Sequence, residues 1–382
     1  MDKIFKSYNK IELKIIVLIL LTFSFYSCKN LDKSNNISYK IVDKEASKNV
    51  KNLYDRLVTL SKNGFAIGHQ DATSYGLGWN YEDNPNEIKS DVNDVVGDFP
   101  AVYGFDIGHI ELAHSRNLDS VSFDVMRKLM VNAHKRGGIV TVSWHLDNPV
   151  TDGNSWDKTS AVSDILEGGS QRAKYELWVE RVANFLNSVQ YNGEVVPIIF
   201  RPFHEMNGFW FWWGDPNCSA SDYVKLWQDT VKLLRDKHHV HNLLYAYSPN
   251  KLNPDDDYMK YYPGDDYVDI LGIDIYDFNN SEDYVKSVIH DLEIVKKVAA
   301  EKNKLYAFTE TGIEKIQTPN WFTEVVYPAI ENSGISWILF WRNASEDHFY
   351  MPYKEHSSVN DFKQFKAKPK TLFLKDLNNI KN

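Results

Sequence analysis

The sequence predicts a single (β/α)8 TIM barrel, a fold of the α/β class. Three observations lead to it: eight short apolar runs follow one another from residue 64 onward, each ends in a polar or Gly-containing stretch, and amphipathic segments separate them. The runs are continuously apolar rather than alternating, as expected for parallel strands covered on both faces. Eight such units in roughly 300 residues match one barrel domain.

The predicted strands, in chain order, are 65–70, 101–108, 138–145, 195–205, 243–249, 267–277, 304–312 and 335–343. Several of the intervening segments carry large apolar residues at helical spacing. Examples are the series Trp178, Val182, Phe185, Val189 and the series Tyr223, Trp227, Val231, Leu234. These segments predict helices that cover the outside of the barrel.

The composition favours some classes of binding partner over others. The formal net charge is −9 and there is no basic run, which argues against binding nucleic acid, because such binding depends on Lys and Arg neutralising phosphate. The chain has 14% aromatic residues, with 11 Trp and 22 Tyr. A flat ring packs on the C–H face of a sugar while polar neighbours serve its hydroxyls. Carbohydrate is therefore the ligand class that the composition favours.

Two glutamates stand out among the predicted strand ends, where a barrel carries its functional residues. Glu205 ends the fourth strand and Glu310 ends the seventh. These strands face each other across the barrel mouth, so the two carboxyl groups can approach to about 5–5.5 Å, the separation in retaining glycosidases. One must attack while ionised, and its charge raises the pKa of the other, which must donate a proton. A lone Glu there would be read as a rim salt bridge, whereas the pair predicts catalysis.

The segment 201–214, RPFHEMNGFWFWWG, resembles the signature of glycoside hydrolase family 26, whose members are mostly β-mannanases. Agreement extends to GHQ at 68–70, WH at 144–145, GIDIY at 272–276, FTETG at 308–312 and WRNA at 341–344. The resemblance implies retaining chemistry, with Glu205 as acid/base and Glu310 as nucleophile. It implies β-1,4-mannosidic linkages in mannan, glucomannan or galactomannan as substrate, cleaved within the chain or from its end.

The resemblance also implies substrate-binding residues. His145 and His204 match sugar-contacting positions. Trp210 and Trp341 are candidate stacking platforms. Asp274 and Arg342 match positions that bind sugar further along the cleft. Tyr276 resembles the tyrosine that orients the nucleophile, and the guanidinium of Arg201 can keep a nearby carboxylate ionised. Trp212 and Trp213 are expected to pack in the interior. Phe209 stands where relatives more often carry a small residue.

Three alternative functions make different demands on the sequence. A metal-dependent barrel hydrolase is disfavoured, because the first strand ends in Gly-His-Gln without a second His two residues on and no HExxH occurs, so neither metal nor other cofactor is expected. A non-catalytic glycan-binding lipoprotein would lack one of the glutamates, and both are present. A mixed-linkage β-1,3-1,4-glucanase of the same family stays open, because it differs only in the sugar recognised at the cleavage point.

The N-terminus predicts export. Four lysines precede the apolar run 15–26, which is too short for a permanent membrane span, so residues 1–27 are expected to be a signal peptide. Ser27-Cys28 resembles the end of a bacterial lipoprotein signal, in which Cys28 is lipidated; an ordinary secreted protein is the alternative. We therefore expect a lipidated N-terminus and polar linker at 28–44, a catalytic barrel domain at 45–376, and a monomer anchored to the membrane in the periplasm or at the outer membrane.

Overall fold

The central sheet is a closed barrel of eight parallel strands, which confirms the predicted fold class. This computed structural model describes residues 40–254 and 256–380, so the expected signal peptide and Cys28 lie outside the described residues. The barrel strands are β1 (Phe65–Gln70), β4 (Val102–Asp106), β5 (Ile139–Trp144), β8 (Ile198–Pro202), β9 (Leu243–Tyr247), β10 (Ile270–Asp277), β11 (Leu305–Ile313) and β12 (Trp337–Phe340). Each pairs with the next, and β12 pairs with β1, with Ala66 opposite Trp337, so the sheet has no open gap.

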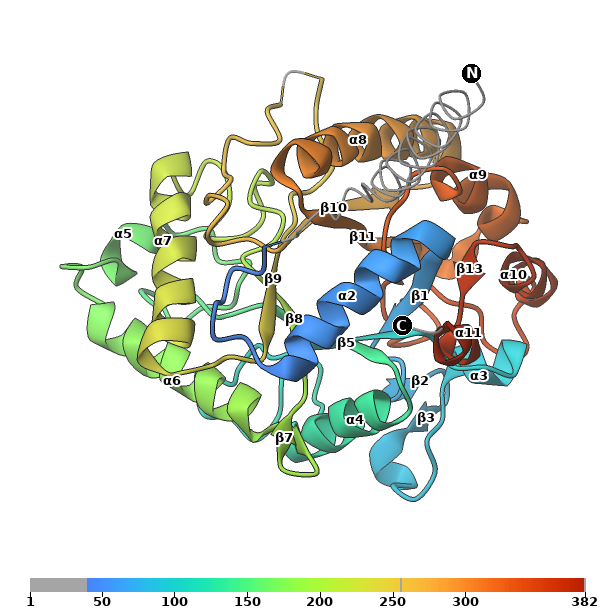
Figure 1. Cartoon of the computed structure of the whole chain (residues 1–382), viewed down its shortest axis with the longest axis horizontal. Helices are drawn as coiled ribbons and strands as arrows, with labels where there is room; N and C mark the ends of the chain where they lie inside the picture. The colour runs from blue at the N-terminus through green and yellow to red at the C-terminus, as the bar shows by residue number, and fades with distance from the viewer. Residues whose placement is uncertain (1–39, 255, 381–382) are drawn as a thin grey trace, which may run out of the picture. The chain divides into compact units, whose positions relative to one another are not determined.

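Helices surround the barrel (Figure 1). They are α2 (Lys48–Asn63), α3 (Asp91–Val96), α4 (Phe123–Lys135), α5 (Val162–Ile165), α6 (Arg172–Ser188), α7 (Ala220–Lys232), α8 (Ser281–Lys302), α9 (Tyr327–Ile330), α10 (Val359–Lys366) and α11 (Leu374–Asn379). Short helical turns are η1 (Tyr81–Asp83), η2 (Leu233–Lys237), η3 (Glu314–Ile316) and η4 (Trp321–Val326). Small strands are β2 (Tyr75–Gly76), β3 (Trp79–Asn80), β6 (Gln190–Tyr191), β7 (Glu194–Val195) and β13 (Thr371–Leu372), the last pairing with β1.

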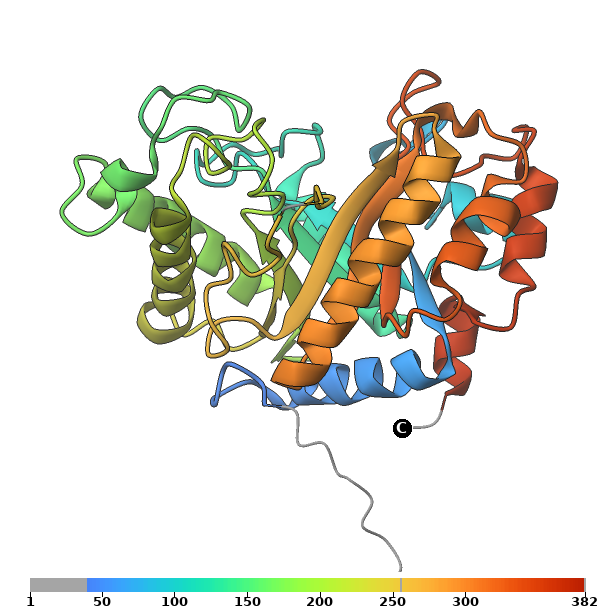
Figure 2. The ribbon, with the colours of Figure 1, turned by 90° about the horizontal axis from the view of Figure 1, so that it is seen from above.

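One end of the barrel is closed by α2. Its buried residues Val50, Leu53, Leu57 and Leu60 recur every three or four positions and form one apolar face. Figure 2 shows α2 lying across the end at which β1 starts, while long loops extend from the opposite end. The site therefore has to form at the loop end, because a helix covers the other.

The strand bounds differ from the prediction mainly at the fourth strand. The prediction of one strand over 195–205 is wrong at its start: Val195 belongs to β7, which pairs with β6 in an antiparallel hairpin, and β8 starts only at Ile198. Pro197 intervenes, and proline cannot donate to a strand ladder. At its other end β8 stops at Pro202, so Glu205 lies in the following loop rather than in the strand.

The folded unit is slightly longer than the predicted 45–376. Val42 and Asp43, expected in the polar linker, are buried. The backbone N–H of Val42 donates to Oδ1 of Asp269 at 2.7 Å, and Oδ2 of Asp43 lies 2.8 Å from Nδ1 of His241. At the other end α11 continues to Asn379. Short-range composition could not reveal these contacts, because their partners are about 200 residues away.

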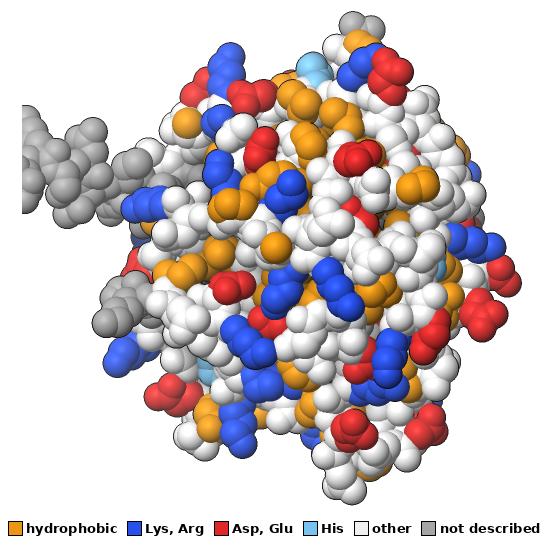
Figure 3. All heavy atoms as spheres, turned by 90° about the vertical axis from the view of Figure 1, so that its right-hand side faces the viewer, with side chains coloured by type: hydrophobic (Ala, Val, Ile, Leu, Met, Phe, Trp, Pro, Cys, Tyr) orange, Lys and Arg blue, Asp and Glu red, His pale blue; other side chains and the backbone are white. Residues whose placement is uncertain are grey.

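The surface in Figure 3 carries basic and acidic side chains interspersed, with apolar side chains between them. Over residues 40–254 and 256–380, the helices are too short or too polar for any of them to cross a membrane.

Candidate active site

Glu205 and Glu310 are both buried at the loop end of the barrel, Glu205 just after the fourth barrel strand and Glu310 within the seventh. Glu310 lies within β11, and Glu205 lies three residues beyond β8. Burial raises the pKa of Glu205 well above its usual range, and the negative charges of Glu310 and Asp274 raise it further. The fold therefore brings together two carboxyl groups that interact electrostatically, and the carboxyl group of Glu205 favours its protonated form.

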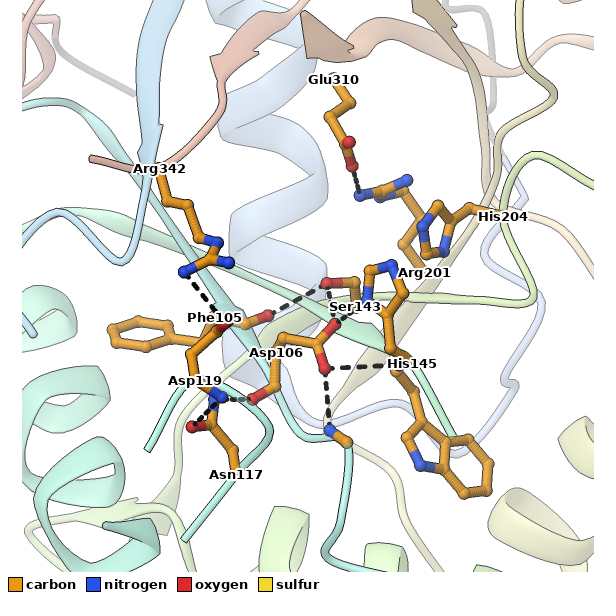
Figure 4. Close-up of polar contacts among 12 residues, drawn as sticks. Phe105, Asp106, Asn117, Asp119, Ser143, His145, Arg201, His204, Glu310 and Arg342 are labelled. Carbon is orange, nitrogen blue, oxygen red and sulfur yellow. Dashed lines mark hydrogen bonds and ion pairs between the residues drawn. The ribbon is translucent and has the colours of Figure 1, made fainter. Parts of the chain in front are cut away.

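Arg201 is fully buried between two carboxylates. Its Nη1 donates to Oδ2 of Asp274 at 2.7 Å, and its Nη2 donates to Oε2 of Glu310. Figure 4 shows the guanidinium reaching the Glu310 carboxylate. Burial alone would lower the pKa of Arg201, but the charges of Asp274 and Glu310 raise it, so the guanidinium stays charged. Arg201 was expected to keep a nearby carboxylate ionised, and the carboxylate of Glu310 lies beside its guanidinium.

Asp274 lies beneath the site, which differs from the prediction that it binds sugar along the cleft. Its side chain is 0% exposed. Besides Arg201, it accepts hydrogen bonds from the hydroxyl of Thr309 at 2.6 Å and from that of Ser248 at 2.7 Å. The residue points into the barrel interior below the rim, where its role is to hold Arg201. The family resemblance identified this carboxylate but not its depth in the barrel.

Tyr276 completes the environment of Glu310. Its hydroxyl donates to Oε1 of Glu310 at 2.6 Å. Burial first, and then the charge of Glu310, raise the pKa of Tyr276 well above its usual range, so it remains a donor. With Arg201 on the other oxygen, Glu310 is oriented by two donors that both interact best with its ionised form.

Glu205 is held differently. Indole Nε1 of Trp210 donates to its Oε2 at 2.7 Å, and its own backbone N–H donates to the carbonyl of Ser248 at 2.8 Å. The backbone of Glu205 has φ +56°, in the left-handed region that side-chain-bearing residues rarely adopt. Trp210 was predicted as a stacking platform; its ring is partly exposed and it also touches the acid/base candidate.

The two predicted histidines lie together. The rings of His145 and His204 are 4.5 Å apart between centroids, edge to face. Burial, followed by the positive charge of Arg201 and of His145, lowers the pKa of His204 well below its usual range, so His204 is neutral. His145 instead lies 2.6 Å from Oδ2 of Asp106 through its Nδ1.

Arg342 belongs to a second polar group, on the loops after β1, β4 and β12. Its Nη1 lies 3.0 Å from Oδ1 of Asp119 and 3.2 Å from the hydroxyl of Tyr75, which in turn donates to Asp71 at 2.9 Å. Burial first, and then the charge of Asp119, raise the pKa of Asp71 to about 8. Trp341, the neighbour of Arg342, is half-buried, with its ring 6.3 Å from that of His145.

Several residues of the site received no role from the sequence. Asp106 ends the second strand and could have been found by the strand-end rule. Asp119 and Trp156 lie in irregular loops and Tyr75 in the two-residue strand β2, so no periodic signal marks them. Trp156 is 47% exposed and stacks on His145 at 5.4 Å between centroids. Trp212 and Trp213, predicted to pack, are fully buried. In the described part of the chain, no three His, Cys, Asp or Glu side chains are grouped as a metal ion requires.

A closed parallel barrel with two buried, interacting glutamates at its loop end defines the class of (β/α)8 glycoside hydrolases. The particular family follows from comparison with known proteins. The chain belongs to glycosyl hydrolase family 26, whose sequence profile matches residues 42–337.

Solved structures agree with this assignment. A family 26 β-mannanase from Bacteroides ovatus is 39% identical, with a TM-score of 0.82, over 86% of this chain and 96% of that one. The catalytic domain of a Bacillus sp. JAMB-750 endo-β-1,4-mannanase is 33% identical, also with a TM-score of 0.82, over 91% of this chain and 97% of that one. A mannan endo-1,4-β-mannosidase of Bifidobacterium adolescentis is 32% identical over 92% of this chain. The chain spans only 37% of that longer relative.

Proposed function

We propose that this protein is a retaining hydrolase of β-1,4-mannosidic linkages in mannan, glucomannan or galactomannan. The observation that carries the proposal is the contrast between the two glutamates. Glu310 accepts hydrogen bonds from Arg201 and Tyr276, whereas burial and the charge of Glu310 favour the protonated form of Glu205. These are the two states that a nucleophile and a general acid need at the same pH.

The reaction follows from this contrast. Glu205 gives its proton to the leaving oxygen while Glu310 attacks the anomeric carbon, forming a covalent glycosyl-enzyme. Esterification removes the charge of Glu310 and with it one cause of the raised pKa of Glu205. Glu205, now deprotonated, then takes a proton from the attacking water, so the second displacement restores the original anomer.

Mannan is favoured as substrate by the relatives, since the similar Bacteroides, Bacillus and Bifidobacterium proteins are all described as mannanases or mannosidases. Mannose differs from glucose in the axial 2-hydroxyl, and a buried polar group built for one orientation discriminates sharply. Side-by-side digestion of β-1,4-mannan and mixed-linkage glucan, with the anomer followed by NMR, tests this. A higher kcat/KM on the glucan would overturn the substrate, and inverted products would overturn the mechanism.

The two roles are separable by mutation. Glu310→Ala should lose nearly all activity on every substrate, because the attacking group is gone. Glu205→Ala should still release an activated aryl leaving group, and azide should rescue turnover as the β-glycosyl azide. Glu314→Ala is a matched control, because Glu314 pairs with His348 at the surface, four residues beyond Glu310. Equal collapse of both site variants without rescue would contradict the assignment.

We also propose that the protein is an exported lipoprotein and acts as a monomer. The support is the lysine-rich start, the apolar run 15–26 and the Ser27-Cys28 pair, which lie outside the described residues. Cys28→Ala should abolish fatty-acid labelling and release the enzyme from the membrane fraction. Cys218→Ala is the control, since Cys218 is buried in the barrel domain. A wild-type protein that is already soluble would contradict the anchor.

A further inference from the structure

The loop after β5 is held at His145 by Asp106, the last residue of β4. Oδ2 of Asp106 lies 2.6 Å from Nδ1 of His145, and Oδ1 lies 3.3 Å from the backbone nitrogen of the same residue. Figure 4 shows both contacts, together with the proximity of His145 to Arg201 and His204. One carboxylate therefore fixes both the ring and the main chain of this histidine.

Asp106 is itself ionised. The hydroxyl of Ser143 donates to its Oδ2 at 2.6 Å, and the backbone N–H of Gly108 donates to its Oδ1 at 2.8 Å. Burial tends to raise its pKa, but the charge of His145 and these hydrogen bonds lower it to about 2. An ionised carboxylate can only accept, so the proton shared with the ring resides on Nδ1 of His145.

Whether the second ring nitrogen, Nε2, also carries a proton depends on the charges around His145. Burial lowers its pKa, while Asp106 on β4 and Glu310 on β11 raise it and Arg201 on β8 opposes them. His204 is neutral, and Asp119 adds a further carboxyl from the loop after β4. The net result is a pKa above the usual value of about 6.5, so at pH 6.5 the ring favours the imidazolium form, with a proton on each nitrogen.

The main chain on both sides of His145 is fixed as well. Buried Glu111 accepts from indole Nε1 of Trp144 at 2.9 Å and from the backbone N–H of Asp147 at 2.9 Å. The imidazole ring packs between Trp156 and Phe211, with centroids 5.4 Å and 5.3 Å away. The ring is thus oriented by its surroundings before any sugar binds.

We propose that Asp106 is a positioning residue: through its contacts with Nδ1 and with the backbone nitrogen of His145, it holds the imidazole ring so that Nε2 faces the sugar that Glu310 attacks. The inference rests on the proposed function, because it assigns this donor to the same bound glycan. A sugar contact by His145 alone would not depend on Asp106. Here Asp106, on the neighbouring strand, controls the orientation and protonation of the His145 ring, and sugar binding depends on both.

The test is Asp106→Asn, which keeps the shape but removes the charge. In ¹H–¹⁵N spectra of the imidazole, the wild type should show both nitrogens of His145 protonated at pH 6.5, and the variant should have lost one proton. The value of kcat/KM at pH 7 should fall about 10- to 100-fold, as for a lost hydrogen bond to a charged group. The loss should shrink as the pH is lowered, because the ring regains its proton.

Asp98→Asn is the matched control, since Asp98 is also a buried aspartate in an ion pair, with Lys366 at 2.8 Å, but lies away from the site. It should leave the His145 spectrum and the pH profile unchanged. In a His145→Gln background, Asp106→Asn should cost little more activity, because the two residues act as one unit. Losses that multiply in the double variant, a pH-independent loss in Asp106→Asn or an unchanged His145 spectrum would each overturn the proposal. The spectra need no substrate, so they test the positioning of His145 by Asp106 independently of activity. If the wild-type protein cleaved no mannan, that result would refute the proposed function and leave the positioning to be decided by the spectra.

Discussion

The buried position of Arg201 allows a quantitative prediction for Arg201→Met. Its guanidinium is 2% exposed and bonds to two carboxylates, those of Asp274 and Glu310, that are themselves buried. Removing one partner of a buried ion pair leaves uncompensated charge and costs about 3–5 kcal/mol. The unfolding entropy of a unit the size of Lys40–Asn382 is roughly 0.7 kcal/mol/K, so Tm should fall by about 4–7 °C.

The pH dependence of this loss has a definite sign. Without the guanidinium, the buried carboxyl groups take up protons on folding, so the folded variant binds more protons than the unfolded one. Stability relative to wild type therefore falls as the pH rises above the unfolded-state pKa of about 4. The deficit in Tm should be largest at neutral pH and should shrink toward pH 4.

Thermal unfolding followed by circular dichroism between pH 4 and pH 8 measures both quantities. Lys286→Ala is the control, because Lys286 forms an exposed pair with Glu282, and such pairs contribute little. If Arg201→Met destabilises no more than Lys286→Ala, or by the same amount at every pH, the buried-charge account of this site is refuted.

Three further predictions concern activity. Trp210→Phe removes a donor to Glu205 that lowers its pKa, so the acid form should persist to higher pH and the alkaline limb of kcat/KM should move upward; an unchanged limb would contradict this. Tyr276→Phe removes the 2.6 Å hydrogen bond to Glu310 and should lower kcat about 10- to 100-fold at little cost in Tm, as steady-state kinetics and melting curves would show. EDTA should leave initial rates on mannan unchanged, because the proposed chemistry needs only two carboxyl groups; a loss reversed by zinc would favour a metal-dependent mechanism.

Most of the barrel could be predicted from sequence because each parallel strand is buried on both faces and therefore reads as a continuous apolar run. The strand-end rule then located Glu205 and Glu310, while the role of Tyr276 came from the family resemblance. Depth below the rim could not be predicted in the same way, because successive residues of a strand face different environments. The family resemblance placed Asp274 in the cleft, although its side chain lies inside the barrel.

The loops were less predictable. Tyr75 and Asp119 meet Arg342 only because the connections after β1, β4 and β12 fold toward one another. No periodic pattern records such a meeting, since the contacts join residues more than 200 positions apart. The same holds for Val42 and Asp43, which sequence composition placed in the linker.

The left-handed backbone conformation of Glu205 means that the residue best for stability at this position differs from the residue that the proposed activity needs. A residue with a side chain costs on the order of 1 kcal/mol at φ +56°, whereas glycine adopts that conformation freely. The hydrogen bond from its N–H to Ser248 involves only main-chain atoms, so a glycine could keep it. A library screened for heat resistance alone would accordingly enrich Gly at position 205 and discard the proposed proton donor. If Glu205 has that role, selection for turnover maintains the glutamate against the preference of its own backbone.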